Sequence, residues 1–96
     1  MMIDTKRTVY HSSKYNKDYR KASKQGKNMK LLEDIIIMLA NDVKLPRKHK
    51  DHSLKGKYKG FRECHIEPDW LLVYRKKDKD ILELYLFRTG NHAELF

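Results

Sequence analysis

The 96-residue chain has few of the residues that cross-link or interrupt a fold. Its one cysteine, Cys64, has no partner for an internal disulfide. With two prolines and four glycines, it shows no linker-like or low-complexity stretch, so we expect a single domain over residues 1–96. Its acidic residues are scattered, whereas a metal-dependent nuclease clusters its carboxylates. We therefore expect no metal and no cofactor.

Long apolar segments are also missing. The start of the chain, MMIDTKR, is not followed by the hydrophobic run of a signal peptide. The most apolar stretch, LLEDIIIMLA at 31–40, contains two acids and is far shorter than the ~20 residues that span a bilayer. We therefore expect a cytoplasmic protein with no membrane partner, whose apolar stretch lies in a core.

Positive charge, in contrast, is abundant. The chain has 22 Lys and Arg against 13 Asp and Glu, a formal charge of +9 and a pI near 9.7. Since 40% of the residues are hydrophobic, this composition is typical of a folded cationic domain rather than a disordered tail. Its expected partners are polyanions: nucleic acid, an acidic protein, or both in turn.

Hydrophobic periodicity predicts a strand and two helices in the first half of the chain. The strand spans 6–11, and Ser12 or Ser13 caps the first helix, which Gly26 ends. The second helix starts at Asn28. Its apolar stripe runs as far as Val43, and we expect it to end at Pro46.

A polar, lysine-rich surface loop at 45–58 follows, and then three strands. The strands are predicted at roughly 60–66, 70–76 and 80–88. In the first, alternation places Cys64 and Ile66 on the apolar face and His65 on the opposite face, with Phe61 and Glu63. The apolar face is expected to continue through Leu71, Val73, Leu82, Leu84 and Leu86.

Together these elements predict an α+β fold in the order β-α-α-β-β-β. Two N-terminal helices pack on one face of a small, mainly antiparallel four-stranded sheet, and the other face stays open. His65 is expected to point to the open face.

Three motifs carry chemistry-bearing residues. RECHIEPDWLLVYR at 62–75 spans the turn between two predicted strands, while DHSLKG lies at 51–56 and FRTGNHAELF at 87–96. Together they resemble YafQ-type toxins of bacterial toxin-antitoxin pairs, within the RelE/ParE superfamily. The resemblance implies a RelE-like fold and catalytic or substrate-contacting roles for His52, His65, Asp69, Trp70, Arg88, His92 and Phe96.

The resemblance also implies an activity and partners. Such toxins are endoribonucleases, or mRNA interferases, that cut mRNA on the ribosome and inhibit translation. The expected partners are therefore mRNA, a cognate acidic antitoxin that folds as it binds, and operator DNA reached through the antitoxin complex.

RNA can be cut without a metal when the neighbouring 2′-hydroxyl acts as nucleophile. A base removes its proton, an acid protonates the leaving 5′-oxygen, and a cation stabilises the phosphorane. We assign His92 as the acid, Asp69 and His65 as the base and its partner in either order, and Arg88 as the phosphate ligand. His52 assists them.

Substrate binding is assigned to aromatic rings and lysines. Trp70 and Phe96 offer flat faces on which a base can stack. Basic residues crowd the loop at 45–58 and the residues just after it, which is an electrostatic footprint for an RNA backbone. The binding set contains Lys50, Lys55, Lys57 and Lys59.

Each assignment has a structural alternative. A lone His65 can be a hydrogen-bonded structural residue, and Asp69 after Pro68 can be a plain turn residue. A single Trp70 can pack at the edge of the core, and Phe96 can cap it. His92 can belong to a solvated terminus, and the lysines to a solvated face.

Two further residues need an explanation of their own. Alternation places Arg88 on the apolar side of its strand, so either the strand has ended or bulged there, or a buried guanidinium meets an anion. Cys64 is interpreted as a small buried hydrophobe rather than a nucleophile.

Two other functions fit the same sequence. A non-catalytic nucleic-acid-binding module could act in an autoregulatory complex with an antitoxin. The gyrase-directed branch of the same superfamily shares the scaffold, but it is not expected to carry this set of histidines.

Overall fold

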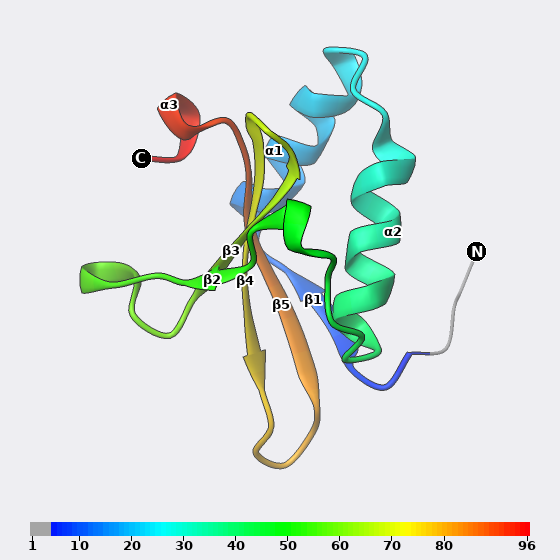
Figure 1. Ribbon diagram of the computed structural model, residues 1–96, viewed down its shortest axis with the longest axis vertical. Coiled ribbons are helices and arrows are strands. Elements are labelled where there is room, and N and C mark those ends of the chain that lie inside the picture. The colour runs from blue at the N-terminus through cyan, green and yellow to red at the C-terminus, as the bar shows by residue number, and fades with distance from the viewer. Residues whose placement is uncertain (1–4) are drawn as a thin grey trace.

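A computed structural model describes residues 5–96 of the chain. Residues 1–4, the start of the segment compared with a signal peptide, lie outside the described part. The fold is α+β, as predicted, with two N-terminal helices on one face of a mixed sheet (Figure 1). The helices are α1 (Ser13–Lys24), α2 (Met29–Ala40) and α3 (His92–Leu95), and the strands are β1 (Thr8–His11), β2 (His52–Ser53), β3 (Arg62–Glu67), β4 (Trp70–Lys77) and β5 (Glu83–Gly90).

The sheet has five strands, so the prediction of four is wrong. Their order is β1-β5-β4-β3-β2, with β1 parallel to β5 and the other neighbours antiparallel. The extra strand, β2, has two residues and lies in the predicted loop. That loop also contains two short 3₁₀ turns, η1 (Arg47–His49) and η2 (Gly56–Tyr58).

The predicted helix caps are confirmed. The Ser12 hydroxyl accepts a hydrogen bond from the Tyr15 backbone N–H (2.9 Å), and the Asn28 side chain accepts one from Lys30 N–H (3.2 Å). The second helix, however, ends at Ala40 and not at Pro46, because the chain turns into the left-handed region at Asp42 (φ 57°). Val43 therefore lies outside the apolar stripe and is 49% exposed.

The main core lies between the helices and the sheet and contains Cys64 and Ile66, as predicted. The prediction that Leu71 and Val73 continue this face is wrong. Register pairs Cys64 with Leu72 and His65 with Leu71, so Leu71 and Val73 belong to the opposite face. There they form a second cluster with Leu95, flanked by Leu54, Phe61 and Phe87.

Strand β5 contains an irregularity that decides where Arg88 points. Tyr74 pairs with Leu86 and Val73 with Arg88, so Phe87 is an extra residue in the ladder. Because paired residues share a face, Arg88 lies on the face of Val73, away from the main core. Leu84 and Leu86 stay in the main core, whereas Leu82 precedes the strand and is 40% exposed.

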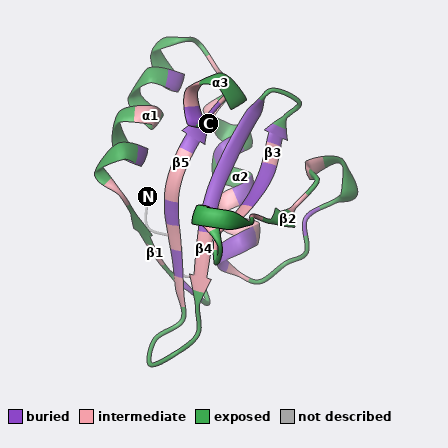
Figure 2. Ribbon diagram, turned by 90° about the vertical axis from the view of Figure 1, so that its left-hand side faces the viewer, coloured by how far each residue is buried: buried purple, intermediate pink, exposed green. Residues whose placement is uncertain are grey.

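The open face is thus the side of the sheet away from α1 and α2 (Figure 2). It carries the small second cluster. The helix α3 follows β5 and buries Leu95 against this cluster. Among residues 5–96, no helix has the length and apolar character to cross a membrane.

Candidate active site

Two histidines face one buried carboxylate on neighbouring strands. His52 of β2 pairs in register with Glu63 of β3, and His65 lies two residues further along β3. Glu63 Oε1 lies 3.6 Å from His52 Nε2 and 3.9 Å from His65 Nε2, and the Glu63 side chain is only 5% exposed. The fold therefore brings His52 and His65 together, with an acid between them.

The other ring nitrogen of each histidine is held by a carbonyl. Nδ1 of His52 donates to the Lys50 carbonyl (2.7 Å), and Nδ1 of His65 donates to the Pro68 carbonyl (3.1 Å). These bonds place the ring hydrogen of the neutral form on Nδ1. Nε2 of both residues is then the atom that can take up or release a proton.

The aspartate before His52 anchors the strand β2. Asp51 accepts hydrogen bonds from the Tyr74 hydroxyl (2.6 Å) and from Arg62 Nε (3.2 Å). Arg62 in turn donates to the Ser53 hydroxyl (2.9 Å). This network ties the short strand to β3 and β4, so His52 is held in a paired strand rather than in a mobile loop.

His92 lies on α3 and not in an irregular tail. Asn91 and Glu94 form a capping box: Glu94 N–H donates to the Asn91 side chain (2.8 Å), and Asn91 N–H donates to Glu94 (2.9 Å). Lys21 of α1 forms an ion pair with Glu94. Its hydrogen bond lowers the pKa of the Glu94 carboxyl below its ordinary value.

The helix α3 brings His92 next to His65. Their ring centres are 6.1 Å apart, and the ring of Phe96 lies 6.1 Å from that of His92. Phe96 is 52% exposed and meets Tyr58 of η2 edge-on at 5.3 Å. Leu95 caps the second cluster instead, so the ring of Phe96 stays accessible.

Arg88 meets both conditions foreseen for it, a bulge and an anion. Its Nε and Nη2 donate to the two carboxylate oxygens of Asp18 on α1, at 2.7 and 3.1 Å. The Thr89 N–H also donates to Asp18 (3.1 Å). The hydrogen bonds that Arg88 donates to Asp18 raise the pKa of Arg88 above its ordinary value, so this guanidinium is a permanent cation.

Two predicted site residues do not fit their assignments. Trp70 is 1% exposed, packs in the main core and donates Nε1–H to the Thr89 hydroxyl (3.0 Å). The prediction that it stacks on a base is therefore wrong, and its structural alternative holds. Asp69 is exposed at the turn after Pro68, which fits its alternative as a turn residue better than the role of a desolvated base.

The basic footprint is exposed, as a binding surface requires. Lys57 Nζ lies over the Tyr58 ring, 5.4 Å from its centre, beside Phe96. The predicted binding lysines all have exposed side chains: Lys50, Lys55, Lys57 and Lys59.

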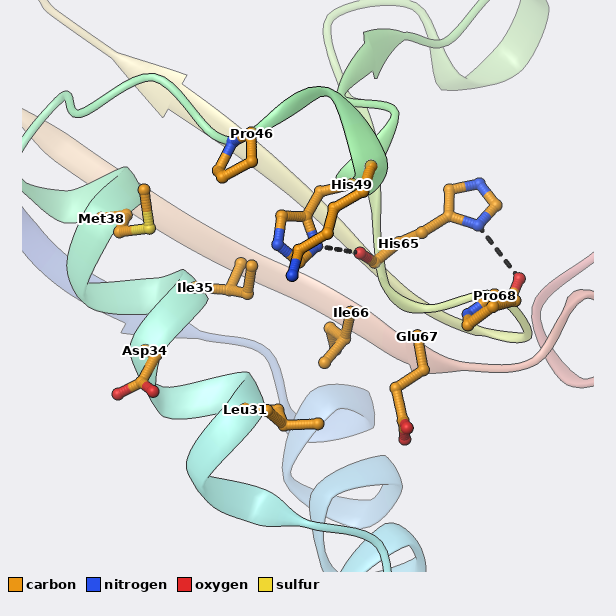
Figure 3. A pocket seen from close by; sticks show the side chains of 11 residues that line it. Leu31, Asp34, Ile35, Met38, Pro46, His49, His65, Ile66, Glu67 and Pro68 are labelled. Carbon is orange, nitrogen blue, oxygen red and sulfur yellow. Dashed lines mark hydrogen bonds between the residues drawn. The ribbon is translucent and has the colours of Figure 1, made fainter.

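A separate hollow of about 490 Å³ lies on the helix side of β3. Figure 3 shows that His65 borders it through its carbonyl oxygen, which accepts a hydrogen bond from His49 Nδ1 (2.6 Å). The imidazole of His65 turns the other way, toward Pro68. This hollow is therefore not the place where the candidate catalytic groups meet.

Sequence reasoning missed two acids of the site. Alternation along the strand predicts that Glu63 shares the face of His65, but it does not predict the contact of Glu63 with two imidazoles. Asp18 lies 70 residues from Arg88 in sequence, so no local pattern pairs the two residues. The sequence shows only that Asp18 lies on a predicted helix, one turn after Lys14. Among residues 5–96, no three His, Cys, Asp or Glu side chains are grouped to hold a metal ion.

Comparison with known families gives one match over most of the chain. Residues 7–96 match the family model described as bacterial toxin of type II toxin-antitoxin system, YafQ. The chain is 43% identical over 91 residues to the mRNA interferase toxin YafQ of Escherichia coli K12, which covers 94% of this chain and 96% of that protein.

Solved structures agree with this match. The crystal structure of the E. coli DinJ-YafQ toxin-antitoxin complex contains a chain 42% identical to this one (TM-score 0.85; 95% of this chain and 98% of that chain covered). A crystal structure of a metal-bound toxin from Helicobacter pylori is 47% identical (TM-score 0.87; 94% and 99% covered).

Proposed function

Because the chain belongs to the YafQ family of bacterial type II toxins and is an mRNA interferase, an endoribonuclease, we propose that it cuts mRNA on the ribosome by acid–base catalysis without a metal. The observation that carries this proposal is the meeting of His65 and His92, with ring centres 6.1 Å apart, beside His52 and Glu63 on the open face of the sheet. Groups that titrate near neutrality suit both proton transfers of RNA cleavage.

The proposed reaction uses the RNA's own 2′-hydroxyl. A base takes the 2′-proton, the 2′-oxygen bonds to phosphorus, and the bond to the 5′-oxygen breaks as an acid protonates that oxygen. The products are a 2′,3′-cyclic phosphate and a 5′-hydroxyl. His92, on the exposed end of α3, is the proposed acid.

The base is drawn from His65 and Asp69. The exposure of Asp69 and the free Nε2 of His65 favour His65, with Asp69 as its partner. Glu63 Oε1 lies 3.6 and 3.9 Å from Nε2 of His52 and His65, so a negative charge stands beside the atoms that would carry a proton taken from the substrate.

Arg88 is the proposed phosphate ligand, and Phe96 the stacking ring. The guanidinium already binds one carboxylate, that of Asp18, in the two-pronged geometry that also fits a phosphate. Its remaining donors can reach a second anion while Asp18 holds it in place. The ring of Phe96 is exposed beside His92 and can carry a base.

We propose a cognate acidic antitoxin as the partner of the cationic surface. The E. coli relative is seen in complex with the antitoxin DinJ, and a net charge of +9 favours an acidic chain that wraps this one. Operator DNA would be bound through that complex. The proposed location is the cytoplasm, where mRNA and ribosomes are found.

Mapping transcript 5′ ends after brief induction tests the proposal. Wild type should create new 5′ ends within translated reading frames, and His92→Ala should lower cleavage by about 10²–10⁴-fold with unchanged folding. Asn16→Ala, an exposed polar change on α1, serves as the control and should cleave normally. If His92→Ala cuts like wild type, or if toxicity follows the lysines alone, non-catalytic binding replaces this proposal.

Metal independence is tested separately. Cleavage by the purified toxin on programmed ribosomes should be the same after a chelator has removed Zn²⁺ and Cu²⁺ from the toxin. The metal-bound relative from H. pylori makes this control necessary. Loss of cleavage that returns with added Zn²⁺ or Cu²⁺ would contradict a metal-free mechanism.

A further inference from the structure

A row of flat side chains crosses the open face beside the candidate active site. Register pairs Tyr85 of β5 with Tyr10 of β1 and with Arg75 of β4, so these three side chains share the open face. Phe61 completes the row, because Arg75 Cζ lies 4.9 Å from its ring centre and 5.6 Å from that of Tyr85. We call Tyr10, Tyr85, Arg75 and Phe61 the aromatic row.

The aromatic row borders a hollow of about 360 Å³. Tyr10 is 44% exposed, and the residues Tyr85 and Arg75 are half-buried. This volume falls within the range of small-ligand sites, and planar walls suit a planar ligand. The hollow is lined by Tyr10, His11, Arg75, Lys77, Glu83 and Tyr85.

Within residues 5–96, the charge of Arg75 is not neutralised by an acidic side chain. Among residues 5–96, no carboxylate forms an ion pair with Arg75, and its Nε is buried without a hydrogen-bond partner. The rings of Phe61 and Tyr85 pack against the guanidinium. Its Nη atoms can therefore donate hydrogen bonds to an anionic ligand. Lys77 adds a second cation, and its register partner Glu83 is the one acid among the described residues that lines the hollow.

The aromatic row is continuous with the candidate active site. Arg75 and Val73 lie two residues apart on β4, about 7 Å, and Val73 pairs with Arg88. Phe87 links the two regions, with its ring 4.8 Å from that of Phe61 and 6.3 Å from that of Tyr85. A nucleotide that flanks the scissile phosphate therefore lies within reach of the row.

We propose that the aromatic row is a subsite for single-stranded RNA, in which a base of the substrate stacks on Tyr10 and Tyr85 and a phosphate binds Arg75. This inference rests on the proposed function, since it concerns the substrate of that site. Planar groups with an unpaired cation recognise a nucleotide. The groove of an amphipathic antitoxin helix would need aliphatic walls, and in the part of the chain that the structure describes no Leu, Ile or Val lines this hollow.

The test measures RNA affinity by fluorescence anisotropy in a His92→Ala background, which prevents cleavage. The probe is a fluorescein-labelled single-stranded RNA of about eight nucleotides. Tyr10→Ala should weaken binding by roughly 5- to 100-fold, whereas Tyr10→Phe should keep it, because the ring and not the hydroxyl stacks. Arg75→Gln should lower the salt slope by about 0.7, the value for one phosphate contact on a single strand.

Two controls separate stacking from a general loss of structure. Tyr19→Ala removes a tyrosine of equal exposure, 44%, from the helix α1, and should bind like the parent. An abasic RNA of the same length and charge should bind the parent and Tyr10→Ala equally, because it has no base to stack.

Several results would overturn the inference: no RNA binding by the parent, equal binding by Tyr10→Ala and Tyr19→Ala, or a defect of Tyr10→Ala for the acidic antitoxin alone. The proposed function is judged by a different measurement, mRNA cleavage by the chain with His92 intact. If the chain does not cleave mRNA but its RNA binding depends on Tyr10, the enzymatic proposal is rejected and the RNA subsite is retained. If the chain cleaves mRNA but its RNA binding does not depend on Tyr10, the subsite is rejected and the enzymatic proposal is retained.

Discussion

At the scale of single residues, Glu63 is the group whose removal is most informative. Glu63→Gln keeps the shape of the buried side chain but removes the negative charge that lies 3.6 and 3.9 Å from two imidazoles. Since an imidazolium formed during the reaction loses its counter-charge, we expect the single-turnover cleavage rate to fall by about tenfold or more, that is ~1.4 kcal/mol or more.

The control for this prediction is another acid of the same strand. Glu67 is exposed at the end of β3, so Glu67→Gln should cleave at the parental rate. Thermal unfolding should show that both variants are folded at the assay temperature. Equal cleavage rates for Glu63→Gln and Glu67→Gln would mean that Glu63 has no part in the chemistry.

Cys64 gives a second prediction at this scale. Its side chain has no exposed surface, and burial raises the pKa of its thiol, so thiolate is scarce in the folded protein. Iodoacetamide should therefore label native Cys64 at least ~100-fold more slowly than the thiol of the urea-unfolded chain. Rapid labelling of the folded protein, followed by mass spectrometry, would contradict a purely structural role.

Residue types predicted the site better than they predicted each role. The motifs named His65 and His92, which are distant in sequence and neighbours in the fold. The motifs could not assign a role to Trp70, because a tryptophan at the start of a strand can either pack in the core or offer a surface for base stacking. The sequence does not single out Glu63, because an acid in a strand is usually in solvent and the strand that places His52 opposite it, β2, is too short to predict.

At the scale of elements, local sequence signals predicted where the helices begin, but they did not predict which face of the sheet each strand residue occupies. Ser12 and Asn28 act through bonds to residues nearby in sequence, so their effect is visible there. Strand β4, in contrast, is buried on both sides from Trp70 to Tyr74, so alternation had no polar residue with which to identify a face. The bulge at Phe87 shifted the pattern again in β5.

The contact between α1 and β5 yields a prediction for Asp18. The carboxylate accepts two hydrogen bonds from Arg88 and one from Thr89 N–H, so it positions the proposed phosphate ligand. Asp18→Asn can accept only part of this set. We expect the cleavage rate constant to fall about tenfold while RNA affinity changes by less than about threefold, since orientation is lost and not the cation.

Two further variants interpret the result for Asp18. Asp34→Asn changes an exposed acid of α2, paired with Lys30, and should cleave normally. Asp18→Glu, which restores the charge, should recover part of the rate. If Asp18→Asn lowers the rate only in proportion to its unfolded fraction, the carboxylate stabilises the fold and does not position Arg88.

At the scale of the whole molecule, the excess of positive charge makes each structural acid important. Arg7 is buried, with its side chain 7% exposed, and ties distant elements together. It donates to Asp42 after α2 (2.7 Å) and to Asp78 in the turn after β4 (2.5 Å), and Lys76 also donates to Asp42 (2.8 Å). The hydrogen bond from Arg7, with that from Lys76, lowers the pKa of the Asp42 carboxyl to about 2.

We therefore expect the free energy of unfolding to differ between the parent and Asp42→Asn by an amount that depends on pH. The folded-state pKa of Asp42 is lower than its ordinary value of 3.8, so the carboxylate stabilises the fold above about pH 4 and stops doing so as pH falls to about 2. Because Asn also tolerates the left-handed backbone at this position, the variant mainly removes charge. At pH 7 it should lose about 1 kcal/mol in the free energy of unfolding, after allowance for solvent screening.

Urea unfolding at pH 7, 4 and about 2 checks this prediction. Protonation of the other acids destabilises parent and variant alike, because it adds positive charge to a chain that already carries +9. The difference between the two proteins is therefore the quantity that reports on Asp42. Asp80→Asn, in the exposed turn before β5, should match the parent at every pH. A difference for Asp42→Asn that persists at pH 2 would show that its effect comes from shape or packing and not from the ion pair with Arg7.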